Sequence, residues 1–275
     1  MAILFNTFFV GKYSKRAVRQ LKVNKAPGLD GVSGNHLRNG SPLLIQHMQL
    51  LFQMRIDSAT VPKSFCTGVV TNILKKGKNA NEFGGYRPIT VSSTLSKVLE
   101  KLVLREVISM CVIDYRQFGF RKHLSCAFAH RLLKRILAKA DSLELSVHIC
   151  NFNISAAFDS VIQSAVFQTL LDAGVNAHIV AIEPVKLKRE LRQGSVFSPI
   201  LFNTLTSKVT KQISYGLRFD TCDSSLISYA DDLLMLSFSL SVLQDNLDEL
   251  VSGYSAIGLQ VNGQKTEFLV FSSAK

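Results

Sequence analysis

The sequence contains no run of 18 uncharged apolar residues, so it predicts no transmembrane helix. Residues 1–10 are apolar, but no basic leader precedes them and charged residues follow, so we expect no signal peptide. Internal repeats and low-complexity tracts are also missing. These absences argue against a membrane-spanning, secreted or repeat protein and favour a globular chain without a membrane partner.

Cysteine is scarce, with five scattered residues and no CxxC pair. Such a set predicts reduced, mostly buried thiols and argues against a disulfide framework or a structural zinc site. We therefore expect an intracellular protein, and the sequence does not distinguish nucleus from cytoplasm. The six histidines show no metal-ligand spacing.

Acidic residues are outnumbered, with 20 Asp and Glu against 32 Lys and Arg, which gives a net charge of +12. A basic surface of this size suits a polyphosphate partner or, less specifically, an anionic membrane surface. A protein that is merely basic is the simpler alternative. At 275 residues and 47% hydrophobic composition, the chain can bury the core of one large or two small domains.

Two adjacent carboxylates stand out in residues 227–236, ISYADDLLML. Asp231 and Asp232 lie between two apolar runs, a pattern that predicts a β-hairpin with the acids at its tip. Two like charges about 4 Å apart repel by roughly 1 to 4 kcal/mol, and a divalent cation between them relieves that cost. An Asp pair alone is more typical of an ordinary turn, because Asp suits turns by bonding its own backbone, so the metal-site interpretation depends on the rest of the chain.

Hydrophobic periodicity predicts helices over residues 18–25, 43–59, 96–112, 125–141, 160–173, 198–215 and 241–257. Runs rich in β-branched and apolar residues predict strands over 67–74, 86–91, 146–154, 258–262 and 266–271. The first two strands would form a hairpin that projects cations. Together these elements predict an α+β fold with an antiparallel sheet that bears the acidic hairpin.

Seven stretches, in this order, resemble the blocks of the reverse transcriptase domain of non-LTR (LINE-type) retrotransposons. They are residues 25–31 (KAPGLDG), 86–90 (YRPIT), 117–121 (QFGFR), 157–159 (AFD), 193–203 (QGSVFSPILFN), 229–232 (YADD) and 259–266 (LQVNGQKT). The resemblance covers roughly residues 18–272. It implies a right-hand polymerase, with a fingers-like region and part of the palm in 1–145, the palm in 146–275, and the thumb absent.

The resemblance implies an RNA-directed DNA polymerase that uses an RNA template, a DNA primer and deoxynucleoside triphosphates, with two Mg²⁺ or Mn²⁺ ions. Catalytic and metal-binding carboxylates would be Asp231, Asp232 and a third residue six positions before Asp159. That position is Asn153 here, so the principal carboxylate is an amide. An amide brings no charge to the cations, and losing about 3 kcal/mol of stabilisation would slow the reaction more than a hundredfold. We do not expect Asp159 to substitute, since it lies past the end of the predicted strand.

Further roles follow from the resemblance alone. Phe158 would lie beneath the incoming sugar and exclude a ribose 2′-hydroxyl, although an ordinary core Phe is the alternative. The other expected nucleotide-binding residues are Lys75, Lys76, Arg87, Gln193 and Lys265, of which the first three would equally suit a solvated basic hairpin. The expected nucleic-acid-binding residues are Arg121, Lys122 and Gly194, followed by Arg131, Lys134 and Arg135, part of which would be plain surface charge.

A second departure from the family pattern is the connection of 33 residues, 160–192, between Asp159 and Gln193, which is shorter than is usual. Together with Asn153 it predicts that this chain is an impaired polymerase. A non-catalytic RNA or RNA–DNA-binding remnant is the alternative, and the response to Asn153→Asp distinguishes the two. A group II intron maturase-like protein is disfavoured by the patterns at 157–159 and 193–196.

Overall fold

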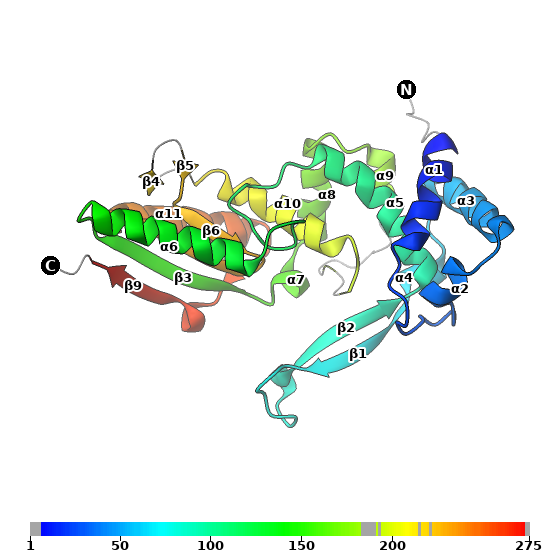
Figure 1. The fold of residues 1–275 in the computed structure, drawn as a ribbon, viewed down its shortest axis with the longest axis horizontal. Helices are drawn as coiled ribbons and strands as arrows, with labels where there is room; N and C mark the ends of the chain where they lie inside the picture. Colours follow the sequence, from blue (N-terminus) through cyan, green and yellow to red (C-terminus); the bar gives the residue numbers. More distant parts are fainter. Residues whose placement is uncertain (1–6, 183–190, 192–193, 214–215, 220–221, 273–275) are drawn as a thin grey trace. The chain divides into compact units, whose positions relative to one another are not determined.

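A computed structural model of the chain describes all residues except 1–6, 183–190, 192–193, 214–215, 220–221 and 273–275 (Figure 1). The chain forms two compact units. Unit 1 comprises the described residues of 1–111, 170–187 and 192–198, and unit 2 those of 112–169, 188–191 and 199–275. Within the described residues, no helix is both long and apolar enough to cross a bilayer. The predicted division of the polymerase at residue 145 stays a prediction.

Unit 1 is mainly helical. Its helices are α1 (Thr7–Arg19), α2 (Gly34–Arg38), α3 (Pro42–Asp57), α4 (Lys63–Cys66), α5 (Thr94–Met110) and α9 (Ala177–Ala181). Helix α1 packs against α3 and α5, as Figure 1 shows in blue and green. Val10, Ala17 and Val18 on α1 are buried, and Met48, Phe52 and Ile56 form the buried stripe of α3. Spacings of four and of seven to eight residues place these side chains on one face of each helix, which is directed into the core.

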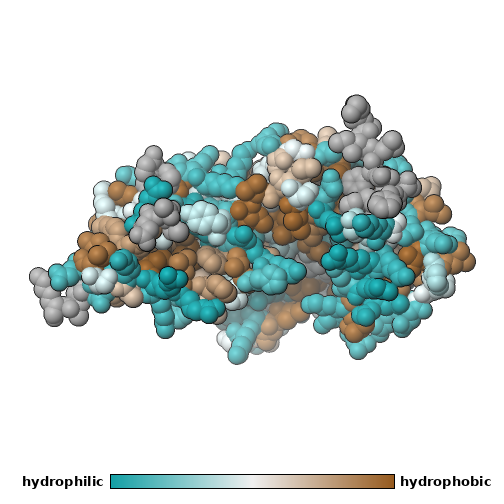
Figure 2. Space-filling view, turned by 45° about the horizontal axis from the view of Figure 1, so that its top comes forward, coloured by the Kyte–Doolittle hydropathy of each residue, from teal (hydrophilic) through white to brown (hydrophobic). Residues whose placement is uncertain are grey.

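A two-stranded antiparallel hairpin also belongs to unit 1. Strand β1 (Gly68–Leu74) pairs with β2 (Tyr86–Ser92), and the short helix η1 (Phe83–Gly85) precedes β2. The side chains of β1 are largely exposed, including Val70 at 60% and Ile73 at 53%. Such exposed apolar groups, brown among teal hydrophilic ones, also occur on the face of the molecule drawn in Figure 2.

The block at residues 25–31 is fixed to the start of α5. Asp30 accepts a hydrogen bond from Ser93 Oγ at 2.7 Å, and the same Oγ caps α5 by accepting from Leu95 N at 3.2 Å. Gly28 lies so close that a Cβ there would come within 2.9 Å of the Ser93 backbone. Within the described part of unit 1, this block therefore acts as a brace for the helix N-terminus.

Unit 2 contains a five-stranded antiparallel sheet. Its strand order is β6-β7-β3-β8, with β9 also paired to β3. The strands are β3 (Val147–Ser155), β6 (Leu226–Tyr229), β7 (Asp232–Ser237), β8 (Gln260–Val261) and β9 (Glu267–Phe271). A separate short ladder joins β4 (Arg218–Phe219) to β5 (Cys222–Asp223).

The helices of unit 2 are α6 (Cys126–Ser142), α7 (Ala157–Ser160), α10 (Ser198–Thr210), α11 (Leu240–Ala256) and the short η2 (Gly263–Lys265). The chain passes from unit 2 to unit 1 within α8 (Gln163–Asp172) and, apart from residues 188–191, returns to unit 2 at the start of α10. Helix α11 packs on β7, β8 and β3, and it buries Leu243, Leu250 and Tyr254.

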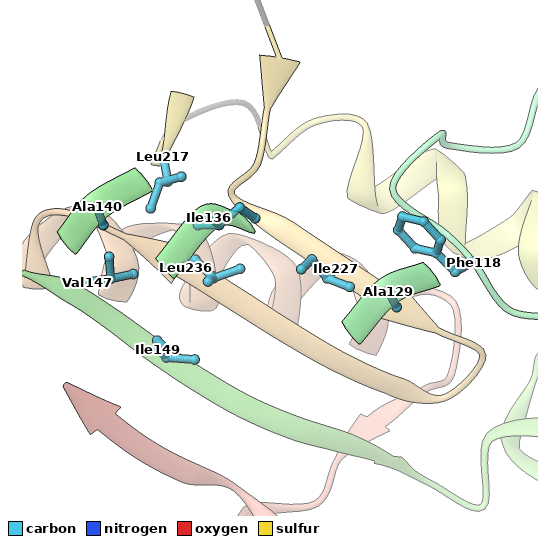
Figure 3. Close-up of a cluster of buried hydrophobic side chains, with 9 residues drawn as sticks. All are labelled: Phe118, Ala129, Ile136, Ala140, Val147, Ile149, Leu217, Ile227 and Leu236. Atoms are coloured by element: carbon cyan, nitrogen blue, oxygen red, sulfur yellow. The ribbon is translucent and has the colours of Figure 1, made fainter. Parts of the chain in front are cut away.

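Helix α6 covers one face of the sheet. Ile136 and Ala140 pack with Val147 and Ile149 of β3 and Leu236 of β7, as Figure 3 shows. Because side chains alternate along a strand, Asn151 and Asn153 lie on the same face of β3 as Val147 and Ile149. The core under α6 therefore fixes which face of the sheet carries Asn153.

The mixed helix and sheet class with an antiparallel sheet is confirmed. Most predicted elements match observed ones within a few residues, but the helix predicted over 18–25 is wrong. The chain is helical over Thr7–Arg19 instead, and Asn24 adopts a positive φ of 55° in the loop that follows. The helix predicted over 198–215 ends at Thr210, and the last two residues of that prediction, 214–215, lie outside the described residues.

Candidate active site

The predicted acidic hairpin is present. Strands β6 and β7 pair antiparallel, and Tyr229 opposite Asp232 closes the turn formed by Ala230 and Asp231. Ala230 has a φ of 59°, a left-handed conformation that costs a non-glycine residue roughly 1 kcal/mol or more. The chain thus accepts local strain at the residue that places the first carboxylate.

Asn153 meets both acids. It lies opposite Asp232 in the register of β3 and β7, so the two side chains share a face of the sheet. Its Nδ2 donates to Asp232 Oδ1 at 2.9 Å and to Asp231 Oδ2 at 3.3 Å. The structure therefore brings together all three residues predicted to be catalytic, and it joins them by an amide that donates to two carboxylates.

The fit of these residues to a divalent cation is incomplete. Hard cations take oxygen ligands, and a catalytic pair of ions requires several carboxylates. Asn153 instead directs its N–H groups at the oxygens that would bind the ions. The described residues include no cluster of three or more His, Cys, Asp or Glu side chains able to hold a metal, so Asp159 does not complete the set. Asp159 is exposed and lies in α7, past the end of β3, as predicted.

Gln117 supports the hairpin from the neighbouring loop. Its Oε1 accepts from Ala230 N at 2.9 Å and from Gly119 N at 2.7 Å, and its Nε2 donates to Ala230 O at 3.3 Å. A Cβ on Gly119 would come within 2.3 Å of Ala230 N. The block at 117–121 therefore packs directly on the turn that carries Asp231.

Next to Gln117, Arg116 anchors the same loop. Its guanidinium is 5% exposed and pairs with Asp114 at 2.9 Å and Asp223 at 2.8 Å. Burial alone would raise the pKa of Asp114, but the hydrogen bonds and the charge of Arg116 hold that pKa below its ordinary value. The Arg116 carbonyl accepts from Ser228 N at 2.9 Å, which fastens the loop to β6. The sequence patterns gave no indication of this network, because Asp223 and Ser228 lie more than 100 residues from Arg116 along the chain.

Phe158 follows β3 in α7 and is half-buried. Its ring stacks on Phe202 with centroids 5.1 Å apart, and it meets Phe120 edge-on at 6.0 Å. One face of the ring is thus occupied by Phe202, which is fully buried. Both the role beneath the sugar and that of a core residue remain compatible with this placement, so the role stays a prediction.

Several predicted nucleotide-binding residues belong to unit 1. Lys75 Nζ donates to Gly84 O at 2.9 Å within the hairpin, whereas Lys76 and Arg87 are exposed. Gln193 lies outside the described residues. Lys265, in η2 of unit 2, is exposed. None of these roles is tested by the structure.

The predicted nucleic-acid contacts divide into two groups. Arg121 Nη1 donates to the carbonyls of Asp114 and Gln117 at 3.2 and 3.1 Å, so at least part of its guanidinium supports the loop. Gly194 has a φ of 105°, and a Cβ there would lie 2.7 Å from Thr90 O, which explains the glycine by packing against β2. The exposed cations are Lys122, Arg131, Lys134 and Arg135.

Comparison with known proteins shows which family has sequences similar to this chain. Residues 73–274 match the family described as "Reverse transcriptase (RNA-dependent DNA polymerase)". The chain is 25% identical, over 88% of its length, to the Pol polyprotein of the type-1 retrotransposable element R2 of Bradysia coprophila. It is 24% identical, over 94% of its length, to the RNA-directed DNA polymerase from mobile element jockey of Drosophila melanogaster. The chain spans only 30% and 31% of the length of these two relatives.

Among solved structures, telomerase from Candida tropicalis, truncated from its C-terminal domain, resembles the chain with a TM-score of 0.53. The two share 15% identity over 78% of this chain and 52% of the other, a likeness that shows a common right-hand polymerase fold. These matches confirm the resemblance and the fold class predicted from the seven blocks. The chain therefore belongs to the reverse transcriptase family and represents a domain of the non-LTR retrotransposon type.

Proposed function

We propose that this chain is the polymerase portion of an RNA-directed DNA polymerase whose nucleotidyl transfer is strongly attenuated by Asn153. The observation that supports this proposal most directly is that the Asn153 amide donates to both hairpin acids, at 2.9 Å to Asp232 and 3.3 Å to Asp231. In an active enzyme of this kind, the attacking 3′-oxygen and the leaving phosphate develop negative charge that cations must balance. Replacing the third carboxylate by an amide removes one negative charge from the ligand set.

The amide has a second effect, since it competes for the ligands that remain. Its N–H groups reduce the repulsion between Asp231 and Asp232. In a site with a carboxylate at position 153, a divalent cation would reduce this repulsion instead. A cation entering this chain would have to displace these two hydrogen bonds. Reverse transcriptases generally use divalent metals. We propose that two Mg²⁺ or Mn²⁺ ions are the cofactors when a carboxylate occupies position 153. Asp231 and Asp232 alone provide ligands for one ion at most.

The substrates follow from the family. We propose an RNA template, a DNA primer and deoxynucleoside triphosphates, which the similarity to RNA-directed DNA polymerases of mobile elements supports. The net charge of +12 supports polyanionic substrates. An intracellular location accords with the reduced thiols of Cys126 and Cys150. The expectation that the thiols are mostly buried is wrong, because among the described cysteines only Cys150 is buried.

Primer extension on an RNA template with Mg²⁺ or Mn²⁺ tests the proposal, with the native chain compared with Asn153→Asp. Asn151→Asp is the matched control, because Asn151 lies two residues away on the same face of β3 and its side chain donates to Glu267 instead of to the hairpin acids. We expect extension to rise only in Asn153→Asp and to be lost again in Asn153→Asp/Asp232→Asn. Efficient extension by the native chain would contradict the proposal.

A second function is supported by the basic surface of unit 2. The exposed face of α6 carries Arg131, Lys134, Arg135 and Lys139 without a described carboxylate bound to them. We propose that RNA or RNA–DNA binding persists when catalysis does not. Equal affinity of the native chain and Asn153→Asp for a primer–template, with no extension by either, would favour this binding function over the catalytic one.

A further inference from the structure

A groove lies between α1 and α5, within unit 1 and separate from the residues assigned above. It has a volume of about 330 Å³. Tyr13 and Arg16 line it from α1, and Lys101, Arg105 and Ile108 line it from α5. Ile108 is 50% exposed, so the floor offers apolar surface to a ligand.

The charge of this groove is of one sign. No Asp or Glu occurs in the sequence before Asp30, and none of the residues that line the groove is acidic. On α5, Lys97, Lys101 and Arg105 recur every four residues, which places them about 6 Å apart along the helix. Like charges at this spacing destabilise a helix by roughly 0.2–0.5 kcal/mol per pair. A bound polyanion would remove that cost.

Two of the cations are already held in place. Lys101 Nζ donates to Gln20 O at 2.9 Å, and burial lowers the pKa of this lysine. The Arg105 guanidinium lies over the Tyr13 ring, 3.6 Å from its centroid. The ion pairs recorded among the described residues include none with Arg16, Lys101 or Arg105. The groove thus presents ordered positive charge beside a guanidinium group stacked on a tyrosine ring.

We propose that the groove between α1 and α5 binds a single strand of RNA, with Arg16, Lys101 and Arg105 on backbone phosphates and the Tyr13–Arg105 pair against a base. The regular spacing of the cations on α5 suits a regularly charged backbone, and guanidinium and tyrosine planes are surfaces on which unpaired bases stack. An acidic peptide would pair with the positive charges of the groove but would have no base to stack on the Tyr13–Arg105 pair. The choice of RNA over DNA rests on the proposed function.

The absence of tryptophan from the chain gives a local probe. Tyr13→Trp introduces a single indole at the groove, and Phe268→Trp does so on β9 of unit 2, where Phe268 is 53% exposed. We expect a single-stranded oligouridylate to change the emission of Tyr13→Trp in a saturable manner and to leave that of Phe268→Trp unchanged. Polyglutamate of the same charge should bind at least about tenfold more weakly. An equal response to polyglutamate, or none to RNA, would overturn the proposal.

A charge-matched pair of variants tests the contacts. Arg16→Gln/Arg105→Gln removes two groove cations, and Lys15→Gln/Arg19→Gln removes two exposed cations of α1 that do not line the groove. In the Tyr13→Trp chain, we expect the first pair to weaken RNA binding about tenfold and to reduce the salt slope by about 1.4, and the second to change affinity less than about twofold. Equal losses would assign the binding to net charge and reject the groove.

These measurements need no catalysis. Thermal unfolding of each variant shows whether it folds. If Arg16→Gln/Arg105→Gln does not fold, the RNA titration of Tyr13→Trp, which keeps every cation, decides the proposal. Failure of RNA to bind here would leave the extension test of Asn153→Asp unaffected. Failure of that extension test would likewise leave the groove result standing.

Discussion

The side-chain amide of Gln117 holds the backbone of Ala230 through both of its polar atoms, accepting from the N–H at 2.9 Å and donating to the carbonyl at 3.3 Å. Ala230 is the residue that turns the hairpin and precedes Asp231. The position of the two acids therefore depends on protein contacts that are independent of any cation. This is why the site can keep its geometry while Asn153 replaces a carboxylate.

Gln117→Leu should destabilise unit 2. Gln117 is 4% exposed, and its loss leaves the N–H groups of Gly119 and Ala230 without their side-chain acceptor. Each unsatisfied buried group costs about 1–3 kcal/mol, so we expect the free energy of unfolding to fall by at least about 2 kcal/mol. Chemical denaturation measures this change. Gln244→Leu, on the exposed face of α11, serves as the control and should cost less than about 0.5 kcal/mol.

The buried pair of Asp114 and Arg116 predicts a pH dependence. Because the folded pKa of Asp114 lies below its unfolded value of about 3.9, its stabilising contribution is complete above about pH 5 and is lost as the pH falls through the folded pKa. At pH 7, Asp114→Asn should cost about 3 kcal/mol, since the charge of Arg116 loses a buried partner. The difference between the native chain and Asp114→Asn should shrink below pH 4.

Urea denaturation at a series of pH values measures that difference. Asp248→Asn, which removes an exposed carboxylate of α11, is the control. A constant gap between native and Asp114→Asn proteins from pH 7 to pH 3 would contradict the assigned ion pair.

Phe158 offers a test of sugar discrimination in the Asn153→Asp chain. If its ring contacts the incoming sugar, Asn153→Asp/Phe158→Ala should use ribonucleotides more readily relative to deoxynucleotides, by about tenfold in the ratio of kcat/KM. A purely structural Phe158, packed on Phe202, would lower stability without changing that ratio. Phe128→Ala, at a position that is 47% exposed on α6, is the control.

Among the cations of the β1–β2 hairpin, we expect Lys76 and Arg87, but not Lys78, to contribute to nucleotide binding. Lys76 and Arg87 are exposed, so Lys76→Ala or Arg87→Ala in the Asn153→Asp chain should raise KM for nucleotides by about tenfold, the loss of one charge-assisted contact. Lys78→Ala is the matched control, because Lys78 pairs with Glu82 at 3.8 Å on the same hairpin. Equal KM values for all three variants would assign these residues to a solvated hairpin.

Local signals in the sequence predicted most of what carries the site. The apolar run before Ser155 predicted β3, and the two apolar runs around Asp231 and Asp232 predicted the hairpin. Their antiparallel register then brings Asn153 opposite Asp232, a placement that the counting of six residues back from Asp159 had anticipated. Short apolar runs bounded by turn residues are typical of buried strands, which is why these elements could be predicted.

Contacts between distant segments were not predictable in the same way. Gln117 and Ala230 are 113 residues apart, and nothing in either local sequence marks them as partners. The start of α1 was missed because Ser14 interrupts its apolar stripe. In the folded chain Ser14 is fully buried and its Oγ donates to Val10 O at 2.6 Å, so a polar residue occupies a core position.

The most direct test of the account is the single-turnover rate of nucleotide addition to an RNA-templated primer, measured for the native chain and for Asn153→Asp at saturating Mn²⁺. The account predicts a rate at least about a hundredfold higher in Asn153→Asp, corresponding to about 3 kcal/mol of transition-state stabilisation from one restored carboxylate. Asn151→Asp should match the native rate. Native and Asn153→Asp chains that extend the primer at the same measurable rate would show that the amide does not limit the reaction, and would contradict the central claim.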